Sequence, residues 1–172
     1  GGLIICKKRE HFNFIKKFKN QGVSGKVFRG NNKIDFPGFN FKFSDLQASV
    51  CLSQMGKLKK RISRLLRNFK LYNQYLKNVS HTKIIHTDIL NGNIPLWVDC
   101  YTTKKKKLLA EFRKNKIGYR DYWIPISSQR GFINKKKFYI TQNSIDKLIW
   151  LPSSYTLTDL DVIKVCKIIK NL

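Results

Sequence analysis

Four cations at helical spacing are the first residues whose arrangement could do chemistry. Lys57, Lys60, Arg64 and Arg67 are separated by three, four and three positions, so they would share one face of a helix. Such a row could contact the phosphates of a nucleic acid. It could equally be the solvated face opposite an apolar stripe. We favour the second interpretation, because the chain contains 27 lysines but only 8 arginines and has no recognisable nucleic-acid-binding motif.

The other reactive side chains do not form a recognisable site. His11, His81 and His86 have neither each other nor a cysteine at metal-ligand spacing. No Gly-x-Ser-x-Gly elbow accompanies the serines, and the glycines do not fit a phosphate-binding loop that leads into a helix. Residue types and spacing alone therefore predict no catalytic residue and no metal site.

The composition narrows the class of protein. The chain has 172 residues, of which 42% are hydrophobic, enough for a packed core rather than wholesale disorder. Its net charge of +25 predicts nonspecific attraction to nucleic acids, although Lys, Asn and Ile all have AT-rich codons that raise their number. There is no apolar run of about 18 residues, so we expect no membrane span. The four cysteines lie far apart, which indicates free thiols and a cytoplasmic protein.

The first third of the chain predicts a strand, a helix and a loop. Residues 3–6 form an apolar run typical of a buried strand, and residues 7–20 have the apolar spacing of an amphipathic helix. Residues 21–43 are rich in glycine and predict a long loop. Ser44 suits a helix N-cap, and apolar residues then recur at helical spacing up to Leu76, with a break expected near Gly56.

The remainder alternates between strand and helix patterns, which predicts an α/β or α+β class. We expect Leu108, Leu109 and Phe112 to point inward from one helix, and Leu160 to be on the apolar side of the last. The predicted elements are a polar loop over 79–93, a strand over 94–101, a helix over 104–116, a strand over 117–126, a loop over 127–141, a helical turn over 144–148 and a helix over 158–172.

An ordered series of short motifs runs from Gly38 to Leu76. It reads Gly-Phe-Asn-Phe-Lys, then Leu-Gln-Ala, a later glutamine, a basic residue and finally a tyrosine-to-leucine segment. This series resembles one stretch of the DegT/DnrJ/StrS family of sugar aminotransferases, which depend on pyridoxal 5'-phosphate (PLP). The matching positions are Gly38, Phe39, Asn40, Phe41, Lys42, Leu46, Gln47, Ala48, Gln54, Arg64 or Arg67, and Tyr72 through Leu76.

Further motifs follow in the order that the family shows. Gly1-Gly2 resembles the end of a Gly-Glu-Gly-Gly motif, and residues 94–101 resemble the strand that opens the small domain. Residues 120–123 resemble a Thr-Arg-Pro-x-Trp region, and residues 151–159 resemble the closing Leu-Pro-Ser and Leu-Thr motifs. The resemblance implies the C-terminal part of a fold-type I aminotransferase. Residues 1–56 would be the tail of the PLP-binding large domain, and residues 57–172 a long linking helix with an α+β small domain.

The resemblance also implies a function. The whole enzyme would transfer an amino group from an amino acid, expected to be glutamate, to a keto-sugar nucleotide for surface polysaccharide or glycan synthesis. It would act as a homodimer or with a complementing N-terminal half. The family's Schiff-base lysine lies before the position that matches Gly1, so no catalytic residue is assigned and these 172 residues alone are expected to be inactive. The alternatives are a small basic module that binds nucleic acid or another polyanion, and a dimerising remnant without catalysis.

Three residues are candidates for binding. The resemblance implies that Asn40 reaches across a dimer and donates a hydrogen bond to the phosphate of the PLP bound by the partner subunit. The alternative is a turn residue, since Asn tolerates loop conformations. Trp123 could stack on a sugar or base and Arg120 could pair with a diphosphate, although Trp123 could equally be a half-buried strand residue. Two positions depart from the family: Lys42 replaces an arginine, and Ser127 replaces a histidine.

Overall fold

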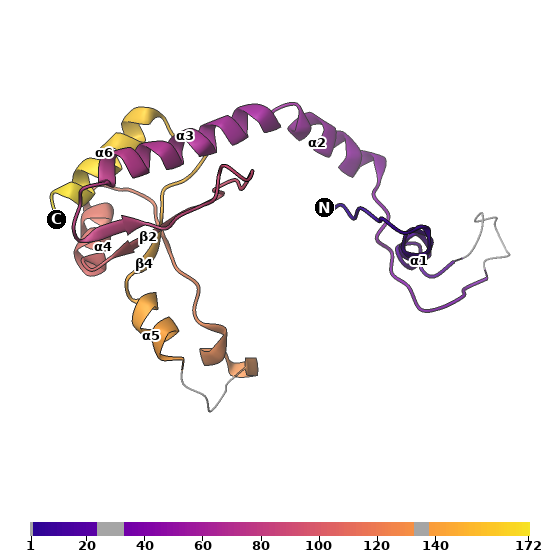
Figure 1. Ribbon diagram of the computed structural model, residues 1–172. Coiled ribbons are helices and arrows are strands. Elements are labelled where there is room, and N and C mark those ends of the chain that lie inside the picture. The colour runs from indigo at the N-terminus through magenta and orange to yellow at the C-terminus, as the bar shows by residue number, and fades with distance from the viewer. Residues whose placement is uncertain (1, 24–32, 133–137) are drawn as a thin grey trace. The chain divides into compact units, whose positions relative to one another are not determined.

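The chain folds into two compact units. The computed structural model describes residues 2–23, 33–132 and 138–172, and the units are Gly1–Gly56 and Lys57–Leu172 (Figure 1). The assignment of these units to a large and a small domain stays a prediction. Among the described residues, six α-helices and a four-stranded antiparallel sheet form a mixed α/β fold.

The first unit contains two helices and a group of aromatic rings. Helix α1 (Arg9–Phe18) confirms the predicted amphipathic helix, and the ring of Phe18 lies 5.2 Å from that of Phe39. Phe14 stacks on Phe36 at 5.0 Å, and Phe39 on Phe41 at 5.1 Å. Offset and edge-to-face ring pairs of this kind contribute beyond their buried area. They tie α1 to the segment that carries Asn40.

Helix α2 (Asp45–Met55) begins at the predicted cap. The Ser44 hydroxyl accepts a hydrogen bond from the Gln47 backbone N–H at 3.3 Å, and the Gln47 side chain accepts one from the Ser44 N–H at 2.9 Å. This capping box satisfies two of the N–H groups that a helix start leaves unpaired. The helix ends at Met55, and α3 (Leu58–Leu76) begins three residues later, which confirms the break near Gly56.

The second unit is built on a sheet with the strand order β1-β2-β4-β3. Its strands are β1 (Thr82–Ile84), β2 (Val98–Thr102), β3 (Arg120–Asp121) and β4 (Leu148–Leu151). All neighbouring strands are antiparallel, and the register pairs Asp99 with Trp150 and Trp150 with Arg120. Because side chains alternate along a strand, these three residues share one face of the sheet.

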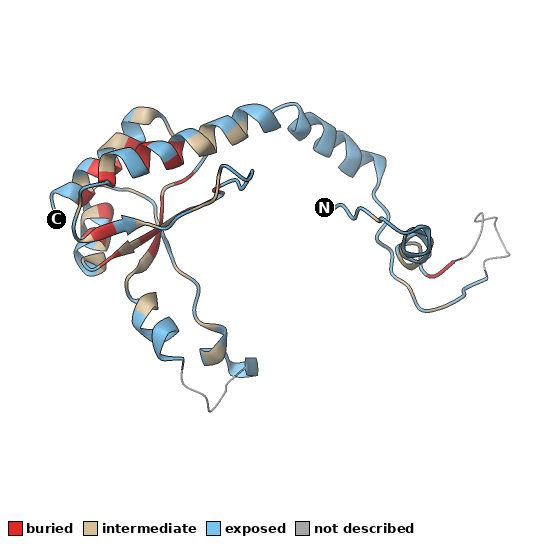
Figure 2. Ribbon diagram, viewed as in Figure 1, coloured by how far each residue is buried: buried red, intermediate tan, exposed pale blue. Residues whose placement is uncertain are grey.

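Three helices bury the opposite face: α3, α4 (Lys105–Lys114) and α6 (Asp159–Lys170). Figure 2 shows the buried residues gathered where these helices meet the strands. Tyr72 of α3 is fully buried, and its hydroxyl donates to the Pro152 carbonyl at 2.8 Å. The residues that fill this core are Phe69, Leu71, Tyr72, Leu76, Val98, Cys100, Leu108, Phe112, Ile149, Leu151, Val162, Val165, Cys166 and Ile169.

Several predicted elements are wrong or misplaced. Residues 3–6 form no strand and Leu3, Ile4 and Ile5 are exposed, since no described strand pairs with them. The predicted loop 79–93 contains β1, which forms only by pairing with β2. The predicted strand 117–126 is reduced to Arg120–Asp121, and the predicted strand 94–101 starts only at Val98. Leu160 is exposed rather than inward-facing.

The region around residue 144 also differs from its prediction. Helix α5 (Tyr139–Ile145) occupies the end of the predicted loop 127–141 and the first two residues of the helical turn predicted over 144–148, and β4 begins at the last residue of that turn. Parts of the predicted loops 21–43 and 127–141 lie outside the described residues. No helix in the described ranges is both long and apolar enough to cross a membrane.

Candidate functional site

Two glycines hold the backbone that presents Asn40. A Cβ atom on Gly38 would lie 2.3 Å from the Gly22 nitrogen, and one on Gly22 would lie 1.7 Å from the Phe36 carbonyl oxygen. Gly22 also has a φ of +74°, which side-chain-bearing residues rarely adopt. Only glycine therefore allows these two segments to approach so closely.

Backbone hydrogen bonds then fix the residues on either side of Asn40. The Phe39 N–H donates to the Phe18 carbonyl at 2.8 Å, and the Phe41 N–H donates to the Lys19 carbonyl at 2.9 Å. Asn40 itself pairs with Asn20 in an isolated antiparallel bridge. The structure thus places Asn40 on a short segment that pairs with Asn20 and directly follows the close contact between Gly22 and Gly38.

The Asn40 side chain has no evident structural task in this segment. Among the described non-glycine residues, only Gln21 and Lys116 have a positive φ, so the backbone at Asn40 does not need an asparagine. Asn40 is exposed, and no hydrogen bond links its amide to any other residue of the described ranges. Its amide group is therefore free to donate to a ligand oxygen, and the exposed Lys42 lies two residues away.

The second candidate group is a row of side chains across the sheet. Arg120 on β3, Trp150 on β4 and Asp99 on β2 lie opposite one another in register. The Trp150 Nε1–H donates to the Asp99 carboxylate at 2.5 Å, and the Arg120 guanidinium lies 5.3 Å from the Trp150 ring centre. The indole thus links a cation on one side to a carboxylate on the other.

Trp123 and Trp97 extend this row into an exposed aromatic surface. The Trp123 ring meets the Trp150 ring edge-on at 5.2 Å, and the Arg120 guanidinium lies 5.0 Å from the Trp123 centre. Trp97 stacks on Trp150 at 5.1 Å. Trp150 is 4% exposed, whereas Trp123 is 59% exposed and outside any strand, so the alternative of a half-buried strand residue is wrong. Arg120 and Trp123, predicted as a pair, are brought together.

Tyr122 completes the cluster beside the carboxylate. Its ring lies 5.2 Å from that of Trp150. Partial burial and, second, the negative charge of Asp99 raise the pKa of the Tyr122 phenol. The phenol stays protonated at neutral pH, and its hydrogen bond to the Asp99 carboxylate also raises its pKa. Together the cluster offers an aromatic face for stacking and one guanidinium, a set suited to recognising a ring that carries negative charge.

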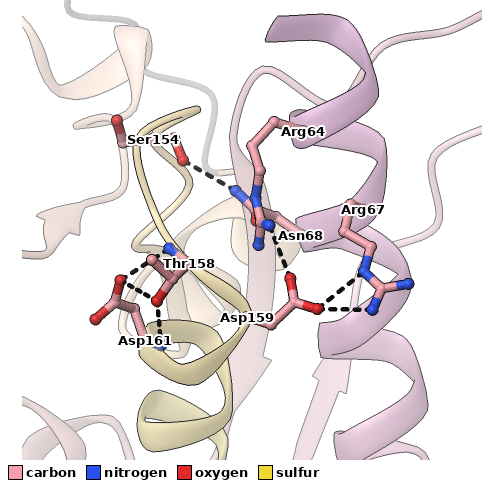
Figure 3. A network of polar contacts seen from close by, with 7 residues as sticks. All are labelled: Arg64, Arg67, Asn68, Ser154, Thr158, Asp159 and Asp161. Carbon is pink, nitrogen blue, oxygen red and sulfur yellow. Dashed lines mark hydrogen bonds and ion pairs between the residues drawn. The ribbon is translucent and has the colours of Figure 1, made fainter. Parts of the chain in front are cut away.

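The basic row on α3 has a structural role at its C-terminal end. Arg64 and Arg67 contact the two oxygens of Asp159 at 2.7 and 2.6 Å, as Figure 3 shows. The hydrogen bonds from Arg67 and then Arg64 lower the pKa of Asp159. Asn68 donates to the Ser154 carbonyl at 2.9 Å in the same network. Arg64 and Arg67, two of the four cations, therefore join α3 to α6. Neither interpretation of the row, as a nucleic-acid contact or as a solvated face, predicted this role.

No group of three or more histidine, cysteine or carboxylate side chains capable of holding a metal occurs in the described part of the chain. All four cysteines are free thiols.

The profile of the DegT/DnrJ/EryC1/StrS aminotransferase family matches residues 1–170. The chain belongs to this family. Over 98% of its length it is 26% identical to the dTDP-4-amino-4,6-dideoxy-D-glucose transaminase of Escherichia coli, and it covers 47% of that enzyme. Family enzymes use PLP and act on nucleotide sugars.

Solved structures of sugar aminotransferases share the fold. CalS13 from Micromonospora echinospora matches with a TM-score of 0.84 at 12% identity, over 95% of this chain and 45% of its own. PseC from Helicobacter pylori, an aminotransferase of pseudoaminic acid biosynthesis, matches with a TM-score of 0.80 at 18% identity, over 95% of this chain and 46% of its own. The chain thus spans slightly less than half the length of the relatives it matches.

Sequence reasoning missed Trp150, Trp97, Tyr122 and Asp99. Trp150 lies in the apolar run Leu148–Leu151 directly before Pro152, which is a signal for a buried strand, but no element was predicted over 149–151. Asp99 lies within a predicted strand, but only the strand register brings its carboxylate to the Trp150 indole. The run of apolar residues could have revealed the strand, whereas the pairing could not be read from it.

Proposed function

We propose that this chain supplies the C-terminal part of a PLP-dependent aminotransferase that moves an amino group from glutamate to a keto-sugar nucleotide. The proposal rests on the family match over residues 1–170 and on the fact that the chain covers just under half the length of its relatives. The product class would serve surface polysaccharide or glycan synthesis. A homodimer, or assembly with a complementing N-terminal half, is part of the same proposal.

Asn40 fits one contact of the cofactor. When bound, PLP supplies the electron-withdrawing ring that makes amino transfer possible. The amide of Asn40 would donate to a phosphate oxygen, a role supported by its exposure and by the rigid backbone contact between Gly22 and Gly38. The lysine that bonds PLP covalently is not assigned to any of these residues, so this chain positions the cofactor rather than activating it.

The cluster around Trp150 fits the nucleotide sugar. The exposed face of Trp123 would stack on the base or sugar, and Arg120 would pair with the diphosphate. Trp150 positions both, because it contacts the Arg120 guanidinium and the Trp123 ring and is itself anchored to Asp99. Stacking of a base on an aromatic side chain is worth roughly 1–3 kcal/mol.

The test uses a fusion in which this chain replaces the matching C-terminal portion of the Escherichia coli relative. Glutamate and the 4-keto counterpart of dTDP-4-amino-4,6-dideoxy-D-glucose are the substrates. We expect Trp123→Ala and Arg120→Gln each to raise KM by about tenfold or more, since 1.4 kcal/mol is a factor of ten. Asn40→Ala should weaken PLP binding by about ten- to a hundredfold, from the roughly 1.5–3 kcal/mol of a hydrogen bond to a charged group.

The matched control is Arg130→Gln, which removes an exposed cation outside the cluster. It should leave KM and PLP affinity unchanged. A KM for the nucleotide sugar that is the same in Trp123→Ala, Arg120→Gln and the control would show that the cluster does not bind this substrate. Unchanged PLP affinity in Asn40→Ala would remove Asn40 from the cofactor site.

A further inference from the structure

A polar cavity of about 520 Å³ lies in the second unit and shares no residue with the cluster around Trp150. Its walls come from the end of α3, the turn that follows, the start of α4 and the end of α6. The residues that matter for its chemistry are Tyr75, Asn78, Ser80, His81, Lys104 and Lys170. Neither the family match nor the proposed function gives this cavity a task.

The cavity is positively charged and lacks a compensating acid. Lys104 and Lys170 both line it, whereas no aspartate or glutamate does. Neither lysine forms an ion pair with a carboxylate of the described residues. The Lys170 ammonium instead lies 5.4 Å from the centre of the Tyr75 ring, which holds it beside the cavity wall. Two cations in one cavity without an anion raise the local potential and attract anionic ligands.

The start of α4 brings the positive end of its helix dipole to the cavity, while the Lys104 N–H itself donates to the Thr102 hydroxyl oxygen at 3.2 Å. Lys104 is the N-cap of this ten-residue helix, no acidic residue lies in its first turn and no side chain caps it. The positive dipole end of a helix N-terminus favours phosphate oxygens. The Thr103 N–H donates to the His81 carbonyl at 3.0 Å and thereby ties His81 to this helix start.

His81 is oriented by a second contact. Its Nδ1 lies 2.9 Å from the Thr82 hydroxyl oxygen, and Nε2 has no partner among the described residues. Burial first and the positive charge of Lys104 second lower the pKa of His81. The ionisable groups that face it are Lys104, Lys170 and Tyr75. A bound anion would offset the lysine charges and raise that pKa again.

We propose that this cavity is a binding site for a small phosphorylated organic molecule, with the phosphate group held by Lys104, Lys170 and His81. The volume is in the range of small-molecule sites, roughly 300–1,000 Å³, and exceeds what a single phosphate needs. Tyr75 and Asn78 would contact the organic part. The inference does not depend on the proposed aminotransferase function, since none of these residues belongs to the cofactor or substrate groups.

The test follows the three histidine side chains of the 172-residue chain by NMR during titration at constant ionic strength. Inorganic phosphate and glucose 1-phosphate are the two probes. We expect a saturable shift of the His81 signal with both, an increase in its pKa, and at least threefold tighter binding of glucose 1-phosphate. The exposed His11 and His86 are internal controls and should show no saturable shift.

Variants separate a site from bulk attraction to a chain of +25 charge. Lys104→Gln with Lys170→Gln should weaken binding of both probes by at least tenfold. The control pair, Lys107→Gln with Lys167→Gln, removes the same charge from exposed positions of the same two helices and should change binding less than twofold. Equal losses in the two pairs, shifts that do not saturate, or equal affinity for the two probes would overturn the proposal.

Discussion

Replacing Tyr72 by phenylalanine removes a single hydroxyl from the core of the second unit. The ring is fully buried, and its hydroxyl donates to the Pro152 carbonyl at 2.8 Å. An acceptor that loses such a bond costs roughly 1–3 kcal/mol. Pro152 is half-buried, so water can replace part of the bond. Because phenylalanine preserves the ring packing, we expect Tyr72→Phe to lower the free energy of unfolding by about 1–2 kcal/mol.

Urea unfolding followed by tryptophan fluorescence measures this loss in the second unit alone. All three tryptophans, Trp97, Trp123 and Trp150, lie within Lys57–Leu172. The control is Tyr139→Phe, since the Tyr139 ring is exposed on α5, and it should change the free energy by less than about 0.5 kcal/mol.

The reasoning would be refuted if Tyr72→Phe were as stable as the wild type, or lost no more than the control. Either result would show that the hydroxyl does not bond Pro152 in solution. It would also remove the contact that joins α3 to the segment directly after β4, the strand that carries Trp150. A change of slope without a change of midpoint would instead indicate an altered denatured state.

Three further predictions concern thiols, acid stability and polyanions. Burial raises the pKa of Cys100 and Cys166 to about 12, so a thiol reagent should label only the other two cysteines until urea is added. The hydrogen bond from Arg67 lowers the pKa of Asp159, so the stability that this carboxylate contributes is present at neutral pH and is lost as the pH falls below the usual carboxyl range. Asp159→Asn should therefore lower the urea midpoint at pH 7 more than at pH 3, whereas Asp146→Asn should show no such difference. The charge of +25 should give DNA binding that is equal for scrambled and chosen sequences and that disappears as salt rises in a filter-binding assay; sequence preference at physiological salt would contradict this.

The helices were predictable because their signals are local. The cap at Ser44, the apolar spacing along α3 and the spacing that buries Leu108 and Phe112 all lie within one or two turns of chain. The strands were harder. β1 has three residues and exists through its pairing with β2, and β4 is a short apolar run without alternation, which periodicity cannot distinguish from a buried helix segment.

The residues of the candidate sites were likewise predictable only where they lie close together in the sequence. Arg120 and Trp123 are three residues apart and were found together by resemblance to a family motif. Asp99 and Trp150 are 51 residues apart, and only the β2–β4 register joins them. The roles of Arg64 and Arg67 depend on Asp159, which is 92 residues from Arg67. Contacts at such separations follow from tertiary packing, so a single sequence could not predict them.

Borohydride trapping of PLP tests most directly whether these 172 residues rely on a lysine from elsewhere. The chain alone and the fusion with the N-terminal portion of the Escherichia coli relative are each incubated with PLP, reduced and mapped by mass spectrometry. We predict that the chain alone shows no stoichiometric adduct at a single lysine and no amino transfer. The fusion should carry one adduct, at one lysine of its N-terminal portion, and should turn over. A single-site adduct with turnover by the chain alone, or a folded fusion that binds no PLP, would contradict the assignment.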